Sequence, residues 1–165
     1  MKIPGWLVPL LFSAGTLLAD APLPPPAHHA TESSDKKTVV ISDPKEGTLC
    51  KTRNGGRVLW RTNGWFRSIF LSDDGIHMVT AYDGLNLIPV NHRPEMTILT
   101  FWKNGKIFRE VPLKELVPEK ESLLRTVSHY EWGSVAGVSK AGKLQVNTAD
   151  GRKLEYDFET GLPSK

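Results

Sequence analysis

Runs of β-branched and aromatic residues, joined in pairs by short glycine-containing turns, constrain this chain more than any other feature of its sequence. Asn104-Gly105 separates residues 97–102 from residues 106–111, and Asn-Gly between two apolar runs is among the strongest hairpin signals. Two further pairs follow the same scheme: residues 65–71 and 76–82 across Ser72-Asp73-Asp74-Gly75, and residues 144–148 and 153–158 across Asp150-Gly151. The sequence therefore predicts an all-β fold of antiparallel hairpins.

The distribution of apolar side chains within these runs predicts where each strand lies. Residues 76–82 and 97–102 are largely apolar on both faces, so we expect central strands covered by packed layers on two sides. In residues 153–158 apolar side chains alternate with charged ones. That alternation predicts a strand near a sheet edge with one face in water.

The hairpins group into three loosely similar units, residues 38–63, 64–113 and 127–162. Pro112 ends the strand before it, because proline cannot continue a hydrogen-bonded ladder. The apolar residues of segment 113–124 then recur at near-helical spacing. One or two short helical turns are expected there, as an insertion between the second and third units.

Two of the units contain an aromatic strand that leads to a [Ser/Thr]-x-Asp-Gly turn. Ser72-Asp73-Asp74-Gly75 resembles the S-P-D-G turn of WD40-like and TolB-type β-propeller blades. Asp150-Gly151, followed by Tyr156-Asp157 and Thr160-Gly161, is similar to the end of pyrroloquinoline-quinone-type propeller repeats. The resemblance implies two to three propeller-blade-like units, with a β-sandwich as the alternative.

The chain departs from that propeller pattern in two ways. It has no Gly-His and no Trp-Asp dipeptide, and two to three blades cannot close a ring that typically needs about four. The expectation is therefore either a compact blade-like pair or sandwich, or a homo-oligomer whose copies complete a ring. Propeller folds host many functions, so the resemblance transfers no catalytic residue.

The N-terminus has the layout of an export signal. Lys2 precedes an apolar run that reaches Ala19, which predicts a signal peptide at residues 1–19 and a periplasmic or extracellular protein. A transmembrane anchor needs about 20 apolar residues, and this run is shorter and broken by prolines and glycines, so membrane attachment would require an uncleaved segment. Residues 20–37 are rich in proline and polar residues and predict a flexible linker before a β-rich domain at residues 38–165.

Charge and cysteine content exclude several classes of protein. The net charge of +3 and the 24% of charged residues are too modest for a nucleic-acid binder. A single cysteine, Cys50, excludes an intrachain disulfide and a multi-thiolate zinc site, and we expect a buried free thiol. Asp73, Asp74 and Asp83 are explained by turns, so neither a metal nor a cofactor is expected.

No arrangement of residues is strong enough to name a reaction. Gly137-Val138-Ser139-Lys140-Ala141 approximates a nucleophile elbow, but the last histidine, His129, precedes that serine, whereas a hydrolase fold places it after. The segment therefore predicts a turn. His129 and Glu131 could act as an acid–base pair, although Ser128 and Glu131 also have the spacing of a helix capping box.

The candidate binding residues are Trp65, Trp102, His129, Glu131 and Trp132. They support three hypotheses. The leading one is an exported, non-catalytic β domain that binds another macromolecule, a protein. The alternative is a carbohydrate-binding module in which exposed tryptophans stack on envelope polysaccharide. A hydrolase using His129 and a carboxylate ranks third, so an enzyme is less favoured than a binding domain.

Overall fold

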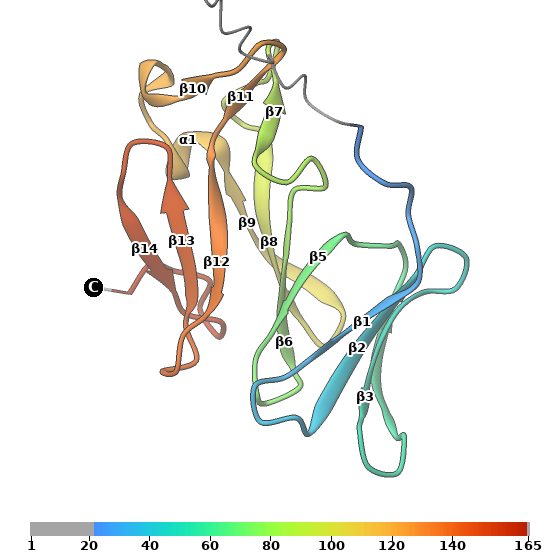
Figure 1. Cartoon of the computed structure of the whole chain (residues 1–165). Helices are drawn as coiled ribbons and strands as arrows, with labels where there is room; N and C mark the ends of the chain where they lie inside the picture. Colours follow the sequence, from blue (N-terminus) through green and yellow to red (C-terminus); the bar gives the residue numbers. More distant parts are fainter. Residues whose placement is uncertain (1–21, 165) are drawn as a thin grey trace, which may run out of the picture.

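The computed structural model describes residues 22–164 and confirms the all-β class (Figure 1). The strands form four antiparallel sheets of three or four strands each. The expected signal peptide, residues 1–19, lies outside the described residues. Within residues 22–164, no helix is long and apolar enough to span a membrane.

The first two sheets have four strands each. Sheet A has the order β1 (His29–Glu32), β2 (Thr38–Asp43), β3 (Gly47–Thr52), β4 (Val58–Thr62). Sheet B has the order β5 (Ser68–Leu71), β6 (His77–Ala81), β8 (Thr97–Lys103), β9 (Lys106–Pro112). In sheet B, β6 and β8 are the two inner strands, which confirms the central position predicted for them.

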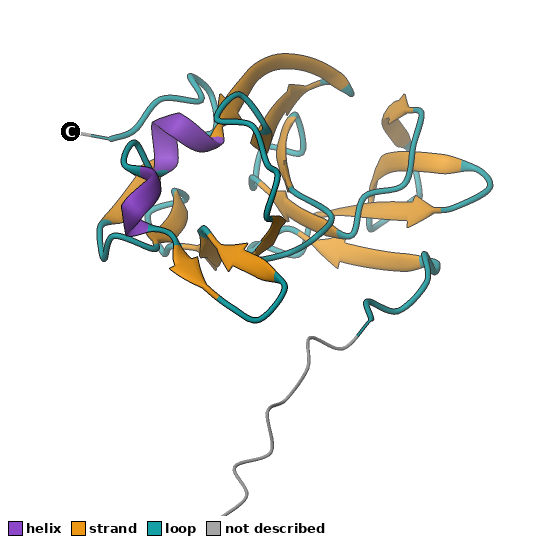
Figure 2. Cartoon of the chain, turned by 90° about the horizontal axis from the view of Figure 1, so that it is seen from above, coloured by secondary structure: helices purple, strands orange, loops and turns teal. Residues whose placement is uncertain are grey.

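The other two sheets have three strands each. Sheet C has the order β10 (Leu124–Arg125), β11 (His129–Glu131), β7 (Leu87–Pro89). Sheet D has the order β12 (Gly133–Val138), β13 (Leu144–Thr148), β14 (Lys153–Tyr156). Strand β14 is therefore an edge strand, as its alternating sequence predicts. The predicted helical insertion is present as α1 (Leu113–Leu116) and the 3-10 turn η1 (Lys120–Ser122), and Figure 2 shows both on the side of the molecule opposite sheet A.

All three predicted hairpins form. Strand β5 pairs with β6, β8 with β9 and β13 with β14, each antiparallel. The tightest turn joins β8 to β9, where Asn104 has φ 51° and Gly105 has φ 72°. Two successive positive φ values match the right-handed twist of the flanking strands, and Asn-Gly is the dipeptide that adopts them most readily.

Sheet B lies between sheets A and D, and a separate core fills each side of it. Met78 and Trp102 of sheet B pack with Val40, Cys50 and Trp60 of sheet A. On the opposite side, a larger core joins sheet B to sheet D and to the segments of sheet C and α1: Val79, Leu99, Phe101, Val111, Leu116, Trp132, Leu144, Val146 and Tyr156. Both faces of sheet B are thus covered, whereas sheets A and D each have an outer face without a further sheet.

The first strands of three sheets meet. Strands β1 of sheet A and β12 of sheet D both contact β5 of sheet B. A serine turn follows each of these strands, in which the backbone N–H of the third residue after the serine donates to the serine carbonyl. The pairs are Lys36 to Ser33 at 2.9 Å, Gly75 to Ser72 at 3.3 Å and Gly142 to Ser139 at 2.9 Å. The turn predicted around Ser139 is confirmed. In sheets A, B and D the first strand is thus followed by the same type of serine turn.

The boundary predicted at residue 38 is too late. Residues 29–32, assigned to the flexible linker, form β1 and pair with β2 along its length. The serine turn that joins these two strands has Lys36 at its positive-φ position, with φ 58°, where glycine is the usual residue. The sequence gives no hairpin signal here, because the turn lacks a glycine and the strand is short and polar. Since β1 pairs with β2, the folded domain begins before residue 38.

A charged turn fixes the C-terminal end of sheet D. Asp157 accepts hydrogen bonds from the backbone N–H groups of Glu159 and Thr160, both at 2.9 Å, and from the side-chain ammonium of Lys143. The Lys143 hydrogen bond, with the backbone bond from Thr160, lowers the pKa of Asp157 to about 2. The ionised carboxylate therefore stabilises the folded chain.

Acid should remove this stabilisation in a defined range. Because the pKa of Asp157 is lower in the folded than in the unfolded chain, its contribution is complete above about pH 4 and is lost as the pH falls towards about 2. We expect Asp157→Asn to lower the free energy of unfolding by about 1 kcal/mol at pH 7. Urea unfolding between pH 7 and pH 2 should show that the free energy of unfolding of Asp157→Asn falls less steeply with acid than that of wild type. The control variant Glu159→Gln should follow wild type. Parallel curves for Asp157→Asn and wild type would contradict this account.

Candidate functional site

The outer face of sheet D is polar and open. Leu144, Val146 and Tyr156 point into the core, and successive side chains of a strand point to opposite faces, so the residues between them face outward. The pairing register places Gln145 beside Glu155 and Asn147 beside Lys153. These four side chains form a charged, amide-rich surface over β13 and β14.

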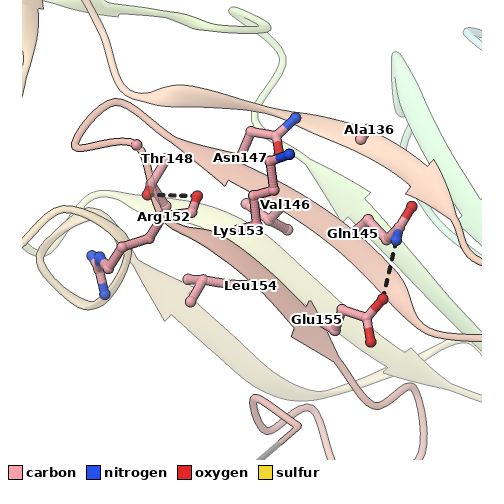
Figure 3. Close-up of a pocket in the computed structure, with 10 residues that line it drawn as sticks. Ala136, Gln145, Val146, Asn147, Thr148, Arg152, Lys153, Leu154 and Glu155 are labelled. Atoms are coloured by element: carbon pink, nitrogen blue, oxygen red, sulfur yellow. Dashed lines mark hydrogen bonds between the residues drawn. The ribbon is translucent and has the colours of Figure 1, made fainter.

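A shallow depression of about 720 Å³ covers this face. Figure 3 shows the side chains of Gln145 and Glu155 joined across the two strands, with Gln145 Nε2 donating to Glu155 Oε1 at 3.0 Å. At the other end Arg152 donates from Nη2 to the carbonyl of Leu116 at 2.6 Å and from Nε to Asp150 Oδ2 at 2.8 Å. The depression therefore presents both signs of charge and several amide groups to solvent.

A second hollow adjoins the depression towards sheet C. It has a volume of about 270 Å³, and its lining shares Asn147 and Thr148 with the depression. Glu131 of β11 and Leu124 of β10 line it as well, and Leu124 is 55% exposed. We call the depression and this hollow together the Asn147 surface. It combines exposed apolar area with carboxylate, ammonium and amide groups.

His129 and Glu131, considered together as an acid–base pair, have different surroundings in the structure. Both lie on β11, two residues apart and so on the same side of the strand. Glu131 lines the hollow, whereas His129 Nδ1 lies 2.9 Å from Ser128 Oγ. Ser128 and Glu131 form no helix cap, because the segment is a strand. Of this pair, Glu131 belongs to the Asn147 surface.

Two of the three candidate tryptophans are core residues. Trp102 is 7% exposed and donates to Thr80 Oγ1 at 3.0 Å, and Trp132 is 1% exposed and donates to the carbonyl of Leu85 at 2.7 Å. Neither offers the free ring face that stacking on a sugar requires. Their expected role as exposed platforms is therefore corrected: the apolar layers on both sides of sheet B bury them.

Trp65 is half-buried and already in contact with other side chains. The guanidinium carbon of Arg67 lies 5.0 Å from the centre of its ring, and the His29 ring meets it edge-on with centroids 5.8 Å apart. Its indole N–H donates to the carbonyl of Ala27 at 2.8 Å. Trp65 thus holds the N-terminal segment, and it lines neither hollow of the Asn147 surface.

The acidic residues considered for a metal site serve turns and backbone contacts. Asp73 accepts from the backbone N–H of Asp35 at 3.0 Å, and Asp83 accepts from that of Arg67 at 3.4 Å. Asp74 Oδ2 lies 2.6 Å from Nδ1 of the buried His77, a pair that the sequence analysis did not identify. In the part of the chain that the structure describes, no group of three or more His, Cys, Asp and Glu side chains could hold a metal ion.

Cys50 is a buried free thiol between sheets A and B, as expected. Burial, assisted by the nearby negative charge of Asp74, raises the pKa of its thiol to about 11. A thiol with so high a pKa is protonated at neutral pH and is a poor nucleophile. Its position explains why Cys50 behaves as a small core residue.

Comparison with known protein families and with curated proteins finds no match to this chain. The assignment of function therefore rests on the residues and their geometry alone.

Proposed function

We propose that this chain is an exported, non-catalytic β domain that binds another macromolecule, a protein, through the Asn147 surface. The observation that carries the proposal is the exposed side chain of Leu124 at the edge of a polar hollow that contains Glu131 and Asn147. Protein interfaces commonly pair apolar anchors with a polar rim. Val127, in the turn between β10 and β11, is a second exposed apolar side chain of sheet C, at 70% exposure.

Binding of envelope polysaccharide is the alternative that the proposal ranks second. A sugar site built on aromatic stacking needs an accessible ring. The rings of Trp102 and Trp132 are buried and so cannot stack on a sugar. The amides and charges of the depression could still bind sugar hydroxyls through hydrogen bonds. A protein partner is favoured because Leu124 offers exposed apolar contact area next to the polar groups of the hollow.

Export is proposed from the N-terminal sequence, and it places the partner in the periplasm or outside the cell. The layout of residues 1–19 is that of a signal peptide. Edman sequencing of the native protein should therefore begin at residue 20. A native chain that begins at Met1 would contradict export with cleavage.

The site can be tested with two substitutions and a matched control. Leu124→Asp and Asn147→Arg alter the Asn147 surface at exposed positions, so we expect wild-type stability and an affinity for the partner reduced about tenfold or more. Ile107→Asp is the control, because Ile107 is 52% exposed but lies on sheet B beside Trp102. A pull-down from host envelope extract should retain one protein with wild type and Ile107→Asp, and lose it with the other two variants.

Two further measurements distinguish a protein partner from envelope polysaccharide and from further copies of this chain. Cosedimentation with protein-free envelope polysaccharide that is abolished by Asn147→Arg would move the carbohydrate hypothesis into first place. A light-scattering mass of one chain would exclude a ring completed by further copies. Equal capture of the same protein by all four forms would contradict the assignment to the Asn147 surface.

A further inference from the structure

The proline-rich segment before β1 is held against the loop between sheets A and B. It contains Pro22, Pro24, Pro25 and Pro26. Proline fixes its own φ and drives the residue before it to extended conformations, so this segment favours the polyproline II helix. Such a helix has no internal hydrogen bonds, and its carbonyl groups remain available as acceptors.

Two side chains of the domain bind two of these carbonyls. The indole N–H of Trp65 donates to the carbonyl of Ala27, and Arg67 Nη2 donates to the carbonyl of Pro24, each at 2.8 Å. A polyproline II helix has about three residues per turn, so carbonyls three residues apart face the same side. The spacing of the two acceptors is therefore the repeat of this helix.

The two donors form one preorganised unit. The Arg67 guanidinium stacks on the Trp65 ring at 5.0 Å, and the Arg67 backbone N–H contacts Asp83 Oδ1 at 3.4 Å. Arg67 Nε is buried and has no hydrogen-bond partner among the described residues. Recognition of proline-rich segments commonly uses an aromatic ring and hydrogen bonds to their carbonyls.

A third contact fixes where the segment ends. His29 Nε2 lies 2.7 Å from the carbonyl of Phe66, and its ring meets Trp65 edge-on. His28 Nδ1 lies 3.2 Å from Asp43 Oδ2. These contacts join the segment to β1, so the chain presents its own prolines to the two donors in a fixed register.

We propose that Trp65 and Arg67 form a binding site for proline-rich peptides, and that residues 22–28 of the same chain occupy it as a displaceable strap. The strap is tethered, so its effective concentration at the site is about millimolar, and a peptide added in trans must compete with it. This site is separate from the Asn147 surface.

The first test removes the polyproline conformation within the purified protein. The strap variant Pro24→Gly/Pro25→Gly/Pro26→Gly should expose the Trp65 indole and speed its hydrogen exchange about tenfold or more, as read from indole N–H resonances. The indoles of Trp60, Trp102 and Trp132 should not change. An unchanged Trp65 indole in the strap variant would overturn the proposal.

The second test adds a synthetic peptide of residues 22–29 in trans. The strap variant should bind it about tenfold more tightly than wild type, whose site is occupied. Adding Arg67→Ala or Trp65→Phe to the strap variant should weaken binding, whereas Arg61→Ala, at an exposed position of β4, should not. Equal binding by all forms would contradict the site. A light-scattering mass of two chains for wild type that reverts to one in the strap variant would show exchange between copies and overturn the assignment to the chain's own segment.

Discussion

Gly133→Ala should lower the free energy of unfolding by about 3 kcal/mol or more, which would remove much of the stability of a domain of this size. Gly133 begins β12 with φ +134°, and a Cβ atom there would lie 2.1 Å from the carbonyl oxygen of Asn147 and 2.9 Å from Cα of Thr148. Both contacts are with the backbone of β13, which cannot move without breaking the pairing of sheet D.

A second glycine, Gly137, distinguishes the cost of the steric clash from the cost of a positive φ. Gly137, in the same strand, has φ +125°, but apart from its own residue and its two chain neighbours no described residue has a heavy atom within 4 Å of the position its Cβ would take. Gly137→Ala should therefore cost only the conformational strain, about 1–2 kcal/mol. Urea unfolding of both variants, followed by tryptophan fluorescence, measures the difference. Equal losses would show that β12 and β13 do not approach each other as closely as the structure indicates.

Trp132→Ala should destabilise the chain by about 3–5 kcal/mol, because it empties a large, fully buried site in the core between sheets B and D. The substitution also leaves the carbonyl of Leu85 without the indole donor that it has at 2.7 Å. Trp132→Phe keeps most of the volume but loses that hydrogen bond, and it should cost less. The measurement is the free energy of unfolding from urea titration, followed by circular dichroism.

The matched control for Trp132 is Trp65→Ala. Trp65 is half-buried and contacts the N-terminal segment, so its removal should cost about 1 kcal/mol and leave the core intact. This pair separates a core tryptophan from one that binds a segment. Similar losses for both variants would contradict the burial on which the correction of the candidate site depends.

The hairpins could be predicted from the sequence because their signals are local. Asn104-Gly105 and Asp150-Gly151 encode the turn, and the alternation around Leu154 encodes the edge position of β14. Strand β1 has neither signal, since its turn uses Lys36 at the positive-φ position and the strand itself is short and polar. Its place in sheet A depends on pairing with β2, which local sequence does not reveal.

The candidate site was only partly predictable for a related reason. Glu131 could be identified as a possible acid–base partner of His129, and the alternation in residues 153–158 indicated a solvent-exposed face on sheet D. Gln145 and Asn147 carry no special pattern, and they gain significance only from the register that places them beside Glu155 and Lys153. The burial of Trp102 and Trp132 likewise depends on sheets stacking from distant parts of the chain.

The most direct test of the Asn147 surface is site-specific photo-crosslinking in the native host. A photoreactive amino acid would replace Asn147 in one form of the protein and Ile107 in another, both exposed positions on different sheets. The account predicts one discrete protein adduct from position 147 and none of the same mass from position 107. The same adduct from both positions, or none from position 147 while position 107 crosslinks, would contradict it.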